Sequence, residues 1–240
     1  MLSVQDVYAG YGKLHILNGV SIEAREKEVT VIVGPNGSGK STLMKTIAGL
    51  TTFYSGSIAL NGDRISKLPA HEIARRGLAY LPQNESVFTQ LTVAENLKMA
   101  GYTVAKEDLQ SRLQGALGMF PVISKYMQTK VQSLSGGERQ MVAMIMALVR
   151  NPKVVMMDEP TANLSPKLAT QVLQNVESLA KDLGLTVLLV EQNARKALEI
   201  GQMAYLLVGG KNVYSGRSSD LLAHSELSQM YLGLKTTSPG

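Results

Sequence analysis

The sequence predicts an α/β fold that is built on a mostly parallel sheet, with an N-terminal antiparallel β subdomain and an inserted α-helical subdomain. Short apolar runs at 29–33, 153–157 and 185–190 are typical of strands that are covered on both faces. Segments with helical apolar spacing alternate with these runs, which favours parallel strands joined by helices. A glycine-rich loop directly follows the first run. We therefore expect polar groups that follow these strands to meet at one edge of the sheet.

The N-terminal subdomain is predicted from two strands that are separated by the turn-prone segment AGYGK. Further along, Asn61-Gly62 marks a tight turn after another strand, and Pro82 follows a short one. The strands expected in this part of the chain are 2–7, 16–24, 29–33, 56–60 and 78–81. The strand at 29–33 is apolar on both faces, so it is assigned to the centre of the main sheet.

The helical subdomain is predicted between about residues 85 and 150, where the apolar spacing becomes helical in VAENLKM and DLQSRLQGALGMF. The chain then returns to the sheet and crosses it through a helix near 166–182. The remaining strands are expected at 154–157, 185–190, 204–208 and 211–214. All of these elements are assigned to a single domain, 1–240.

Composition excludes several classes of function. The chain has 240 residues, no cysteine and a net charge of +5. Disulfides and thiolate chemistry are therefore excluded, and any metal must be a hard ion held by oxygens. No apolar run reaches the roughly 18 to 20 residues that cross a bilayer, and the first residues lack the pattern of a secretory signal. The basic residues are dispersed, which favours an ordinary solvated surface over a nucleic-acid patch. We expect a cytosolic protein.

The segment GPNGSGKST at 34–42 has the spacing of a phosphate-binding P-loop, and it lies between an apolar strand and a helix. Its glycines let backbone amides converge on phosphate oxygens, and the helix start adds further donors. Lys40 is expected to reach the outer phosphates, and the Ser41 hydroxyl is suited to Mg²⁺. The residues expected to bind nucleotide here are Gly34, Asn36, Gly37, Ser38, Gly39, Lys40, Ser41 and Thr42. The alternative is a glycine-rich turn with an unrelated Lys-Ser pair.

Two carboxylates, Asp158 and Glu159, follow the apolar run that ends at residue 157. Side chains alternate along a strand, so the two acids cannot do the same work. Asp158 is expected to hold Mg²⁺, through water, and Glu159 to polarise the attacking water. Acids at a strand end can instead cap the next helix or form surface ion pairs, and the P-loop argues against that alternative.

The segment LSGGERQ at 134–140 resembles the signature of ABC ATPases. Ser135 and the glycines Gly136 and Gly137 lie where a helix begins, so a hydroxyl and open backbone amides can receive an anion there. A serine-capped helix without a ligand is the alternative. In the family, the anion is the γ-phosphate of ATP bound to a partner subunit. The resemblance covers essentially the whole chain, and it implies a P-loop NTPase (RecA-like) core.

The resemblance also implies roles for two residues outside these motifs. Tyr11, in the expected turn between the first two strands, matches the aromatic residue that stacks on adenine. Gln83, after the strand at 78–81, matches the glutamine that touches Mg²⁺ and water and leads to the helical subdomain. The cofactors implied are ATP and Mg²⁺. The catalytic residues implied are Glu159, Lys40, Gln83 and Gln192, and the metal ligands implied are Ser41, Gln83 and Asp158.

Two positions depart from the family pattern. Gln192 stands where the family usually has a histidine that contacts the γ-phosphate, and it can donate a hydrogen bond without carrying charge. Ser165 stands where many members have aspartate. Both departures resemble one subgroup, the ATPase subunits of importers for branched-chain amino acids and related amides or urea. They leave open the rate of hydrolysis and whether the two sites of a dimer are equivalent.

The partners implied are a second ABC ATPase subunit, identical or homologous, and separate transmembrane permease subunits, with a solute-binding protein acting indirectly. The expected location is the cytoplasmic face of the membrane, and no nucleic-acid partner is expected. Val87, Phe88 and Leu91 are candidates for the permease contact, although core packing explains each of them equally well. The cargo, the direction of transport and the identity of the second cassette stay open.

Other P-loop proteins are the alternatives. A soluble ABC ATPase of translation or DNA repair usually carries two cassettes in one chain or a long coiled-coil insertion, and this chain has neither. An export-type ABC ATPase shares the motifs and stays open. A small-molecule kinase or a switch GTPase needs no LSGGERQ segment, and a GTPase needs an N-K-x-D element that is absent here.

Overall fold

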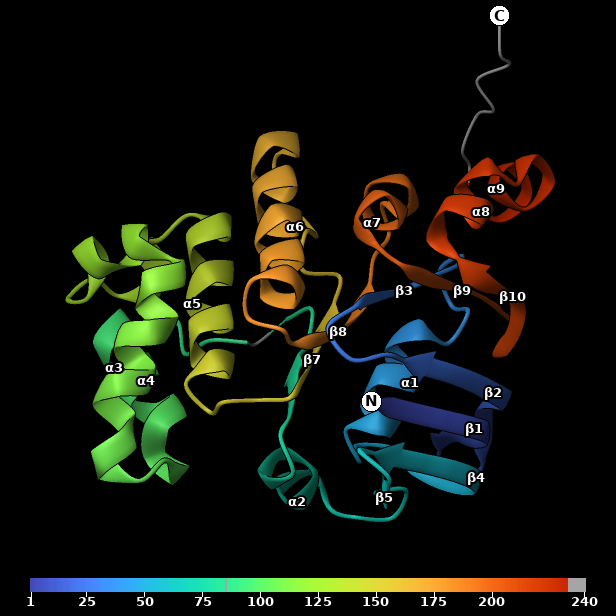
Figure 1. Cartoon of the computed structure of the whole chain (residues 1–240), viewed down its shortest axis with the longest axis horizontal. Helices are drawn as coiled ribbons and strands as arrows, with labels where there is room; N and C mark the ends of the chain where they lie inside the picture. The colour runs from blue at the N-terminus through green and yellow to red at the C-terminus, as the bar shows by residue number, and fades with distance from the viewer. Residues whose placement is uncertain (85, 233–240) are drawn as a thin grey trace, which may run out of the picture.

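Two β-sheets lie one above the other, and a group of helices stands beside them (Figure 1). The structure is a computed structural model, and it describes residues 1–84 and 86–232. One sheet has six strands and is parallel at its centre, and the other has four antiparallel strands from the N-terminal part of the chain. The predicted α/β class is confirmed.

The main sheet brings the carboxyl ends of its central strands to one edge. Its strands are β3 (Val29–Val33), β6 (Leu78–Leu81), β7 (Val154–Asp158), β8 (Thr186–Val190), β9 (Met203–Val208) and β10 (Lys211–Arg217), in the order β10-β9-β3-β8-β7-β6. All residues of β3, β7 and β8 are buried, as their apolar runs predict. Val190 pairs with Ile32 on one side and with Asp158 on the other. The loops that follow these strands are therefore neighbours.

The N-terminal sheet is longer than the sequence predicted. It contains β1 (Leu2–Tyr11), β2 (Leu14–Ala24), β4 (Thr52–Leu60) and β5 (Asp63–Arg64), in the order β2-β1-β4-β5. The turn expected over AGYGK is limited to Gly12 and Lys13, and Tyr11 is the last residue of β1. The physical reason is that β1 pairs with β2 and β4 on its two edges, so its ladder continues through a segment that is weak in local strand propensity.

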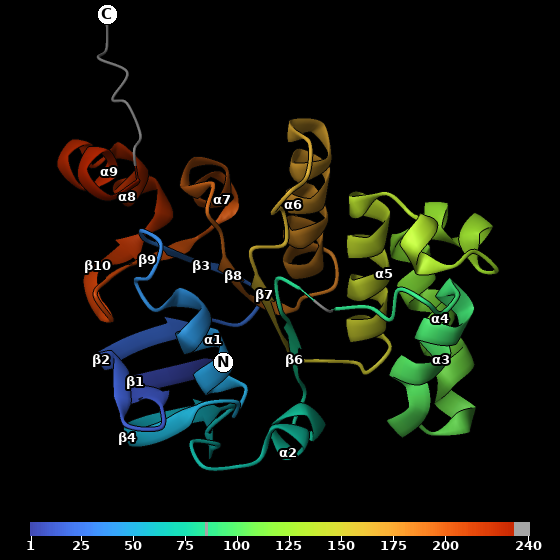
Figure 2. The ribbon, with the colours of Figure 1, turned by 180° about the vertical axis from the view of Figure 1, so that it is seen from behind.

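Helices cover both faces of the main sheet and also form the group beside it. They are α1 (Lys40–Ile47), α2 (Ala70–Arg75), α3 (Val93–Ala100), α4 (Lys106–Met119), α5 (Gly136–Leu148), α6 (Pro166–Lys181), α7 (Ala194–Ile200), α8 (Ser218–Ala223) and α9 (Ser225–Leu232), with short 3₁₀ turns at Gly101–Thr103, Pro121–Tyr126 and Val131–Ser133. Figure 2 shows α3, α4 and α5 standing together beyond the β6 edge, at the opposite end from β10. No helix among the described residues is long and apolar enough to cross a bilayer.

Side-chain alternation along the central strands divides the interior into two cores. Ile32 of β3 packs with α1 and the N-terminal sheet. Its neighbours Val31 and Val33 pack on the opposite face with helices that include α5, α6 and α7. The helix α1 is therefore buried between the two sheets, which fixes the loop that leads into it. α2 and α7 were not predicted, because each has only six or seven residues and too few turns for a clear apolar period.

Asn96 fixes the segment that connects β6 to the helical group. It lies on α3 and is fully buried. Its Nδ2 donates to the carbonyl oxygens of Phe88 and Thr92, both at 2.9 Å, and its Oδ1 accepts from the N–H of Phe88 at 2.8 Å. A buried amide with both ends satisfied holds two segments in one arrangement. The exposed side chain of Phe88 is thereby attached to α3.

Asn96→Ala is expected to lower the free energy of unfolding by about 2 to 4 kcal/mol, because the N–H of Phe88 loses its partner, and its carbonyl oxygen keeps only the N–H of Leu91, at a partly buried place. Urea unfolding followed by circular dichroism measures the change. Gln90→Ala is the control, since Gln90 belongs to the same segment and its side chain is exposed. Equal stability of the two variants would contradict this role of Asn96.

Candidate functional site

The loop between β3 and α1 requires glycine at several positions. Gly34 has a φ of 148°, Gly37 of 77° and Gly39 of 100°, a region that other residues rarely adopt. A Cβ atom on Gly34 would lie 2.1 Å from the carbonyl oxygen of Leu207. Gly39 is the N-cap of α1 and offers no side chain to its first amides. These amides therefore stay open toward an anion.

Lys40 is buried and leans over the same loop. Its Nζ donates to the carbonyl oxygens of Gly34 at 2.9 Å and Pro35 at 3.0 Å. Burial lowers the pKa of Lys40, and the nearby carboxylates of Glu159 and Asp158 act in the opposite direction. The loop carbonyl oxygens that accept from this ammonium group are neutral. A triphosphate would give it an anionic partner, and hydrogen bonds to an anion are stronger.

Other loop residues also fit a bound anion. Among the described residues, the buried Oγ of Ser38 has no hydrogen-bond partner, which is costly for a hydroxyl unless a ligand supplies one. Asn36 is exposed at the tip of the loop, and Thr42 is buried in the first turn of α1. The loop thus combines an unpartnered hydroxyl, a cation and open amides around one space.

Ser41 and Asp158 lie in contact with each other, and both are expected to hold Mg²⁺. The Ser41 Oγ donates to Asp158 Oδ1 at 3.1 Å. Tyr80, two residues before Pro82 on β6, donates from its hydroxyl to Asp158 Oδ2 at 3.3 Å. Burial raises the pKa of Asp158, and these two hydrogen bonds oppose that rise. Hydroxyl and carboxylate oxygens are the donors that Mg²⁺ prefers, so the residues present fit that ion.

Tyr80 was missed by sequence reasoning. It faces Asp158 across neighbouring parallel strands, because Tyr80 pairs with Met156 and side chains two residues apart share a face. Its pKa is raised, first by burial and then by the Asp158 charge. The only signal available in the sequence was its alternation on the strand that leads to Gln83.

Glu159 and Gln83 form a second contact in the site. The Gln83 Nε2 donates to Glu159 Oε2 at 2.9 Å. Glu159 has a φ of 48°, a left-handed conformation that is uncommon for a residue with a side chain. Burial raises the pKa of Glu159, Lys40 opposes the rise, and Asp158 adds to it. The carboxylate thus points into a partly buried site that Lys40 and Asp158 also influence.

Gln192 is the second residue after β8, at the same edge of the sheet. Its side chain is exposed, and its N–H donates to the buried carboxylate of Glu191 at 3.2 Å. Ser165, the other departure from the family pattern, caps α6, since its Oγ accepts from the N–H of Leu168 at 3.5 Å. Ser165 therefore provides the helix-capping oxygen that an aspartate would also provide.

Tyr11 stands at the end of β1 with 44% of its surface exposed. The turn after it is fixed by Tyr54 of β4, whose hydroxyl donates to the carbonyl oxygens of Gly12 at 3.0 Å and Leu14 at 3.2 Å. The Tyr54 ring stacks on His15 with centroids 4.0 Å apart. Sequence reasoning missed this role of Tyr54, because the pairing of β1 with β4 brings Tyr54 beside the turn that follows Tyr11.

Ser135 begins α5 and is engaged in a capping box. Its Oγ accepts from the N–H of Glu138 at 3.3 Å, and Glu138 Oε2 accepts from the Ser135 N–H at 2.8 Å. Gly136 and Gly137 form the first turn of the helix. Figure 1 shows α5 and α1 on different sides of β7 and β8. The structure therefore does not bring Ser135 to the P-loop of its own chain.

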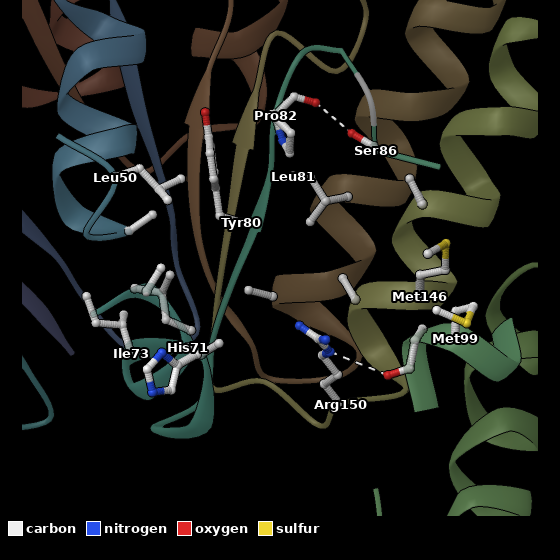
Figure 3. Close-up of a pocket in the computed structure, with 18 of the residues that line it drawn as sticks. Leu50, His71, Ile73, Tyr80, Leu81, Pro82, Ser86, Met99, Met146 and Arg150 are labelled. Carbon is white, nitrogen blue, oxygen red and sulfur yellow. Dashed lines mark hydrogen bonds between the residues drawn. The ribbon is translucent and has the colours of Figure 1, made fainter. Parts of the chain in front are cut away.

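A groove of about 550 Å³ opens between β6 and α2 on one side and α3 and α5 on the other. Figure 3 shows Tyr80 and Leu81 on one wall, with Met99 and Met146 on the other. Met99, Leu50 and Phe88 are about half exposed, at 50%, 53% and 53%. The groove therefore has apolar surface that water covers in the isolated chain.

Residues 17–162 match the protein family described as ABC transporter. The chain is 50% identical to the "Probable branched-chain amino acid transport ATP-binding protein" of Archaeoglobus fulgidus, over 98% of this chain and 99% of that protein. It is 38% identical to a high-affinity branched-chain amino acid transport ATP-binding protein of Pseudomonas aeruginosa, over 97% and 100%. It is 34% identical to a lipopolysaccharide export system ATP-binding protein of Haemophilus influenzae, over 97% of each.

Solved structures agree with the fold. A nucleotide-free ATP-binding cassette from an ABC transporter aligns with a TM-score of 0.85 at 26% identity, covering 98% of this chain and 99% of that one. A dimeric cassette in a post-hydrolysis state, bound to ADP and phosphate, aligns with a TM-score of 0.78 at 25% identity, covering 91% and 99%.

Lys40→Ala is expected to weaken ATP binding by about 10- to 100-fold, because charge-assisted hydrogen bonds contribute about 1.5 to 3 kcal/mol each. Titration of the full chain with a fluorescent ATP analogue measures the affinity. Lys181→Ala is the matched control, because it removes the same charge from an exposed position at the end of α6. Unchanged affinity of Lys40→Ala would rule out its role at the phosphates.

Proposed function

The chain belongs to the ABC transporter family, and we propose that it is the ATP-hydrolysing subunit of a membrane importer for branched-chain amino acids or related small polar solutes. The observation that carries the proposal is the separation of two phosphate-binding elements within one chain. The P-loop leads into α1 and the Ser135 turn leads into α5, with β7 and β8 between the two helices (Figure 1). Each element has its own groups that can bind phosphate, and the two elements do not meet within one chain.

A head-to-tail pair of cassettes supplies the missing half to both sites. The P-loop of one chain then faces the Ser135 turn of the other, and two ATP molecules lie between them. The similarity to a dimeric cassette that holds ADP and phosphate supports this arrangement. The second cassette is identical or homologous, since a two-fold or pseudo-two-fold pair satisfies both sites.

Within each site, the residues of this chain divide the work. Lys40, the hydroxyl of Ser38 and the loop amides bind the phosphates. Ser41, Gln83 and Asp158 would hold Mg²⁺, which supplies positive charge to the phosphate oxygens during transfer. Glu159 orients the water that attacks the γ-phosphate, and Gln83 holds the Glu159 carboxylate in place. Hydrolysis thus depends on positioning and charge stabilisation.

Gln192 completes the γ-phosphate side of the site. Its amide can donate one or two hydrogen bonds to phosphate oxygens but carries no positive charge. A neutral donor contributes less than a charged one. The site therefore depends more on Lys40 and on the partner chain's signature turn for the charge that develops during transfer.

The groove of Figure 3 is proposed as the contact for a permease subunit. A short permease helix with an apolar face would bury the exposed parts of Leu50, Phe88 and Met99. Tyr80 lines this groove while its hydroxyl contacts Asp158, so the permease contact and the nucleotide site share one side chain. With this contact, the chain would lie at the cytoplasmic face of the membrane.

Import is favoured over export by the comparisons. The two relatives named for branched-chain amino acid transport are 50% and 38% identical, and the relative named for lipopolysaccharide export is 34% identical. The two departures that resemble the importer subgroup are Gln192, within the segment VEQN at 190–193, and Ser165 before Pro166. A solute-binding protein on the other side of the membrane would choose the cargo.

Glu159→Gln is expected to form a stable dimer with Mg-ATP, because the variant keeps the phosphate contacts and loses the group that orients water. Size-exclusion chromatography with light scattering should show twice the monomer mass with ATP and the monomer mass with ADP. Adding Ser135→Arg to this variant should abolish the dimer while ATP affinity of the monomer stays within about twofold. A Ser135→Arg monomer that no longer binds ATP would contradict a role in the partner's site.

Phe88→Asp is expected to reduce recovery of permease subunits by at least about tenfold, because burying an unpaired carboxylate in an apolar contact is costly. Tagged full-length chain is purified from solubilised membranes of the source cells, and the polytopic proteins that accompany it are quantified. Leu183→Asp is the control, since Leu183 is 44% exposed and lies away from the groove. Recovery of the wild-type chain with ribosomes or DNA instead of permeases would overturn the transport proposal.

A further inference from the structure

Glu191 is a buried carboxylate at the edge of the sheet that carries the site, and the functions assigned so far do not use it. It follows β8 and is 2% exposed. Its Oε1 accepts from the N–H of Thr161 at 3.0 Å. Its Oε2 accepts from the Thr161 hydroxyl at 2.9 Å and from the N–H of Gln192 at 3.2 Å. Three donors from two loops therefore converge on one side chain.

Both loops carry a residue with a proposed catalytic role. Thr161 is two positions after Glu159, and Gln192 is itself the proposed γ-phosphate donor. The N–H of Glu159 also donates to the carbonyl oxygen of Val190 at 2.9 Å. The segment 159–161 is thus attached to the end of β8 at both of its ends, by Val190 and by Glu191.

The backbone of Glu159 needs such attachment. Its φ of 48° lies in the left-handed region, which costs a non-glycine residue about 1 to 3 kcal/mol unless the surroundings hold it there. Pro160 follows, and proline restricts the conformation of the residue before it. Because Thr161 is fixed by two hydrogen bonds to Glu191, the chain can relax at Glu159 only by breaking them.

We propose that Glu191 is a positioning residue that holds Glu159 and Gln192 in one arrangement on the γ-phosphate side of the site. The inference rests on the roles given to Glu159 and Gln192 in the proposed function. In this role, Glu191 contacts neither ATP nor the attacking water. It acts through the loop of Thr161 and through the backbone of Gln192.

The chemistry requires a carboxylate at this position. An ionised carboxylate only accepts hydrogen bonds, and here it meets three donors. Burial raises the pKa of Glu191, and the hydrogen bonds from Thr161 and Gln192 oppose that rise. Glutamine has nearly the same shape, but its NH₂ group would face at least one of these donors. Glu191→Gln therefore breaks the attachment with little change in packing.

Glu191→Gln in the full-length chain tests the proposal. We expect the kcat for ATP hydrolysis to fall by about 10- to 100-fold, with KM and the dissociation constant for ATP within about twofold, because the phosphate loop is untouched. Amide hydrogen exchange of the nucleotide-free chain should become faster in segments 159–162 and 191–193 and stay unchanged in 29–33. A residue that only stabilised the fold would not separate kcat from KM in this way.

Variants of Thr161 test the same attachment, because the Thr161 hydroxyl is one of the donors to Glu191. Thr161→Ser keeps the hydroxyl and should behave like the wild type, whereas Thr161→Val loses it and should lower kcat. Combining Thr161→Val with Glu191→Gln should add little to the effect of Glu191→Gln alone, because both remove the same contact. Since Thr161→Val keeps the backbone contact and the packing, it tests the proposal even if Glu191→Gln fails to fold.

Glu28→Gln is the matched control, because Glu28 is partly buried at the opposite end of β3 and is remote from the loops in question. It should leave kcat and exchange at 159–162 unchanged. Unchanged exchange in both segments of Glu191→Gln, or a loss of ATP affinity equal to the loss of kcat, would overturn the proposal. The exchange result does not depend on catalysis, so it separates a failed attachment from a failure of the role assigned to Glu159.

Discussion

Hydrogen bonding between the parallel strands β3, β8 and β7 is the constraint on which the rest of the molecule depends. Val190 pairs with Ile32 on one side and with Asp158 on the other, so the three strands end at the same height. The P-loop, the acid pair and the Glu191 turn therefore emerge side by side, although they are far apart in the sequence. A shift of one residue between β7 and β8 would turn Asp158 to the other face and away from Ser41. The apolar cores on both faces of the sheet resist such a shift, because it would also exchange every buried side chain of the strand.

Much of this arrangement was predictable, because the central strands are defined by local apolar runs and the P-loop by a spacing with a direct physical meaning. The strand at 29–33 was predicted with the bounds that the structure shows. Tyr80 and Glu191 were not identified, since strand pairing brings Asp158 to Tyr80 and Thr161 to Glu191, and the segment VEQN gives no sign that its glutamate is buried. The extent of β1 was underestimated for the same reason, as pairing on two edges outweighs the turn propensity of AGYGK. Sequence patterns thus give the elements and the charged groups, whereas the side chains that hold those groups in place depend on tertiary contacts.

In the proposed dimer, the separation of α1 from α5 would give the nucleotide a structural task as well as a chemical one. A triphosphate that is held by the P-loop of one chain and by the Ser135 turn of another contributes binding free energy to the contact between chains. Loss of the γ-phosphate removes that contribution without any change in the fold of either chain. Tyr80 would extend the effect to the proposed permease contact, because an occupant of the groove would pack on the same side chain that donates to Asp158.

The replacement of histidine by Gln192 gives the Glu191 contact its significance. A charged imidazolium is attracted to a phosphate over several ångströms and from several directions. A neutral amide depends on distance and angle, so it is effective only if its backbone is held still. Glu191 fixes the N–H of Gln192 and, through Thr161, the loop that carries Glu159. In the proposed mechanism, a site that lacks the histidine charge on this side would compensate through alignment, because one buried carboxylate would set the positions of both Glu159, which is proposed to orient water, and Gln192, which is proposed to meet the phosphate.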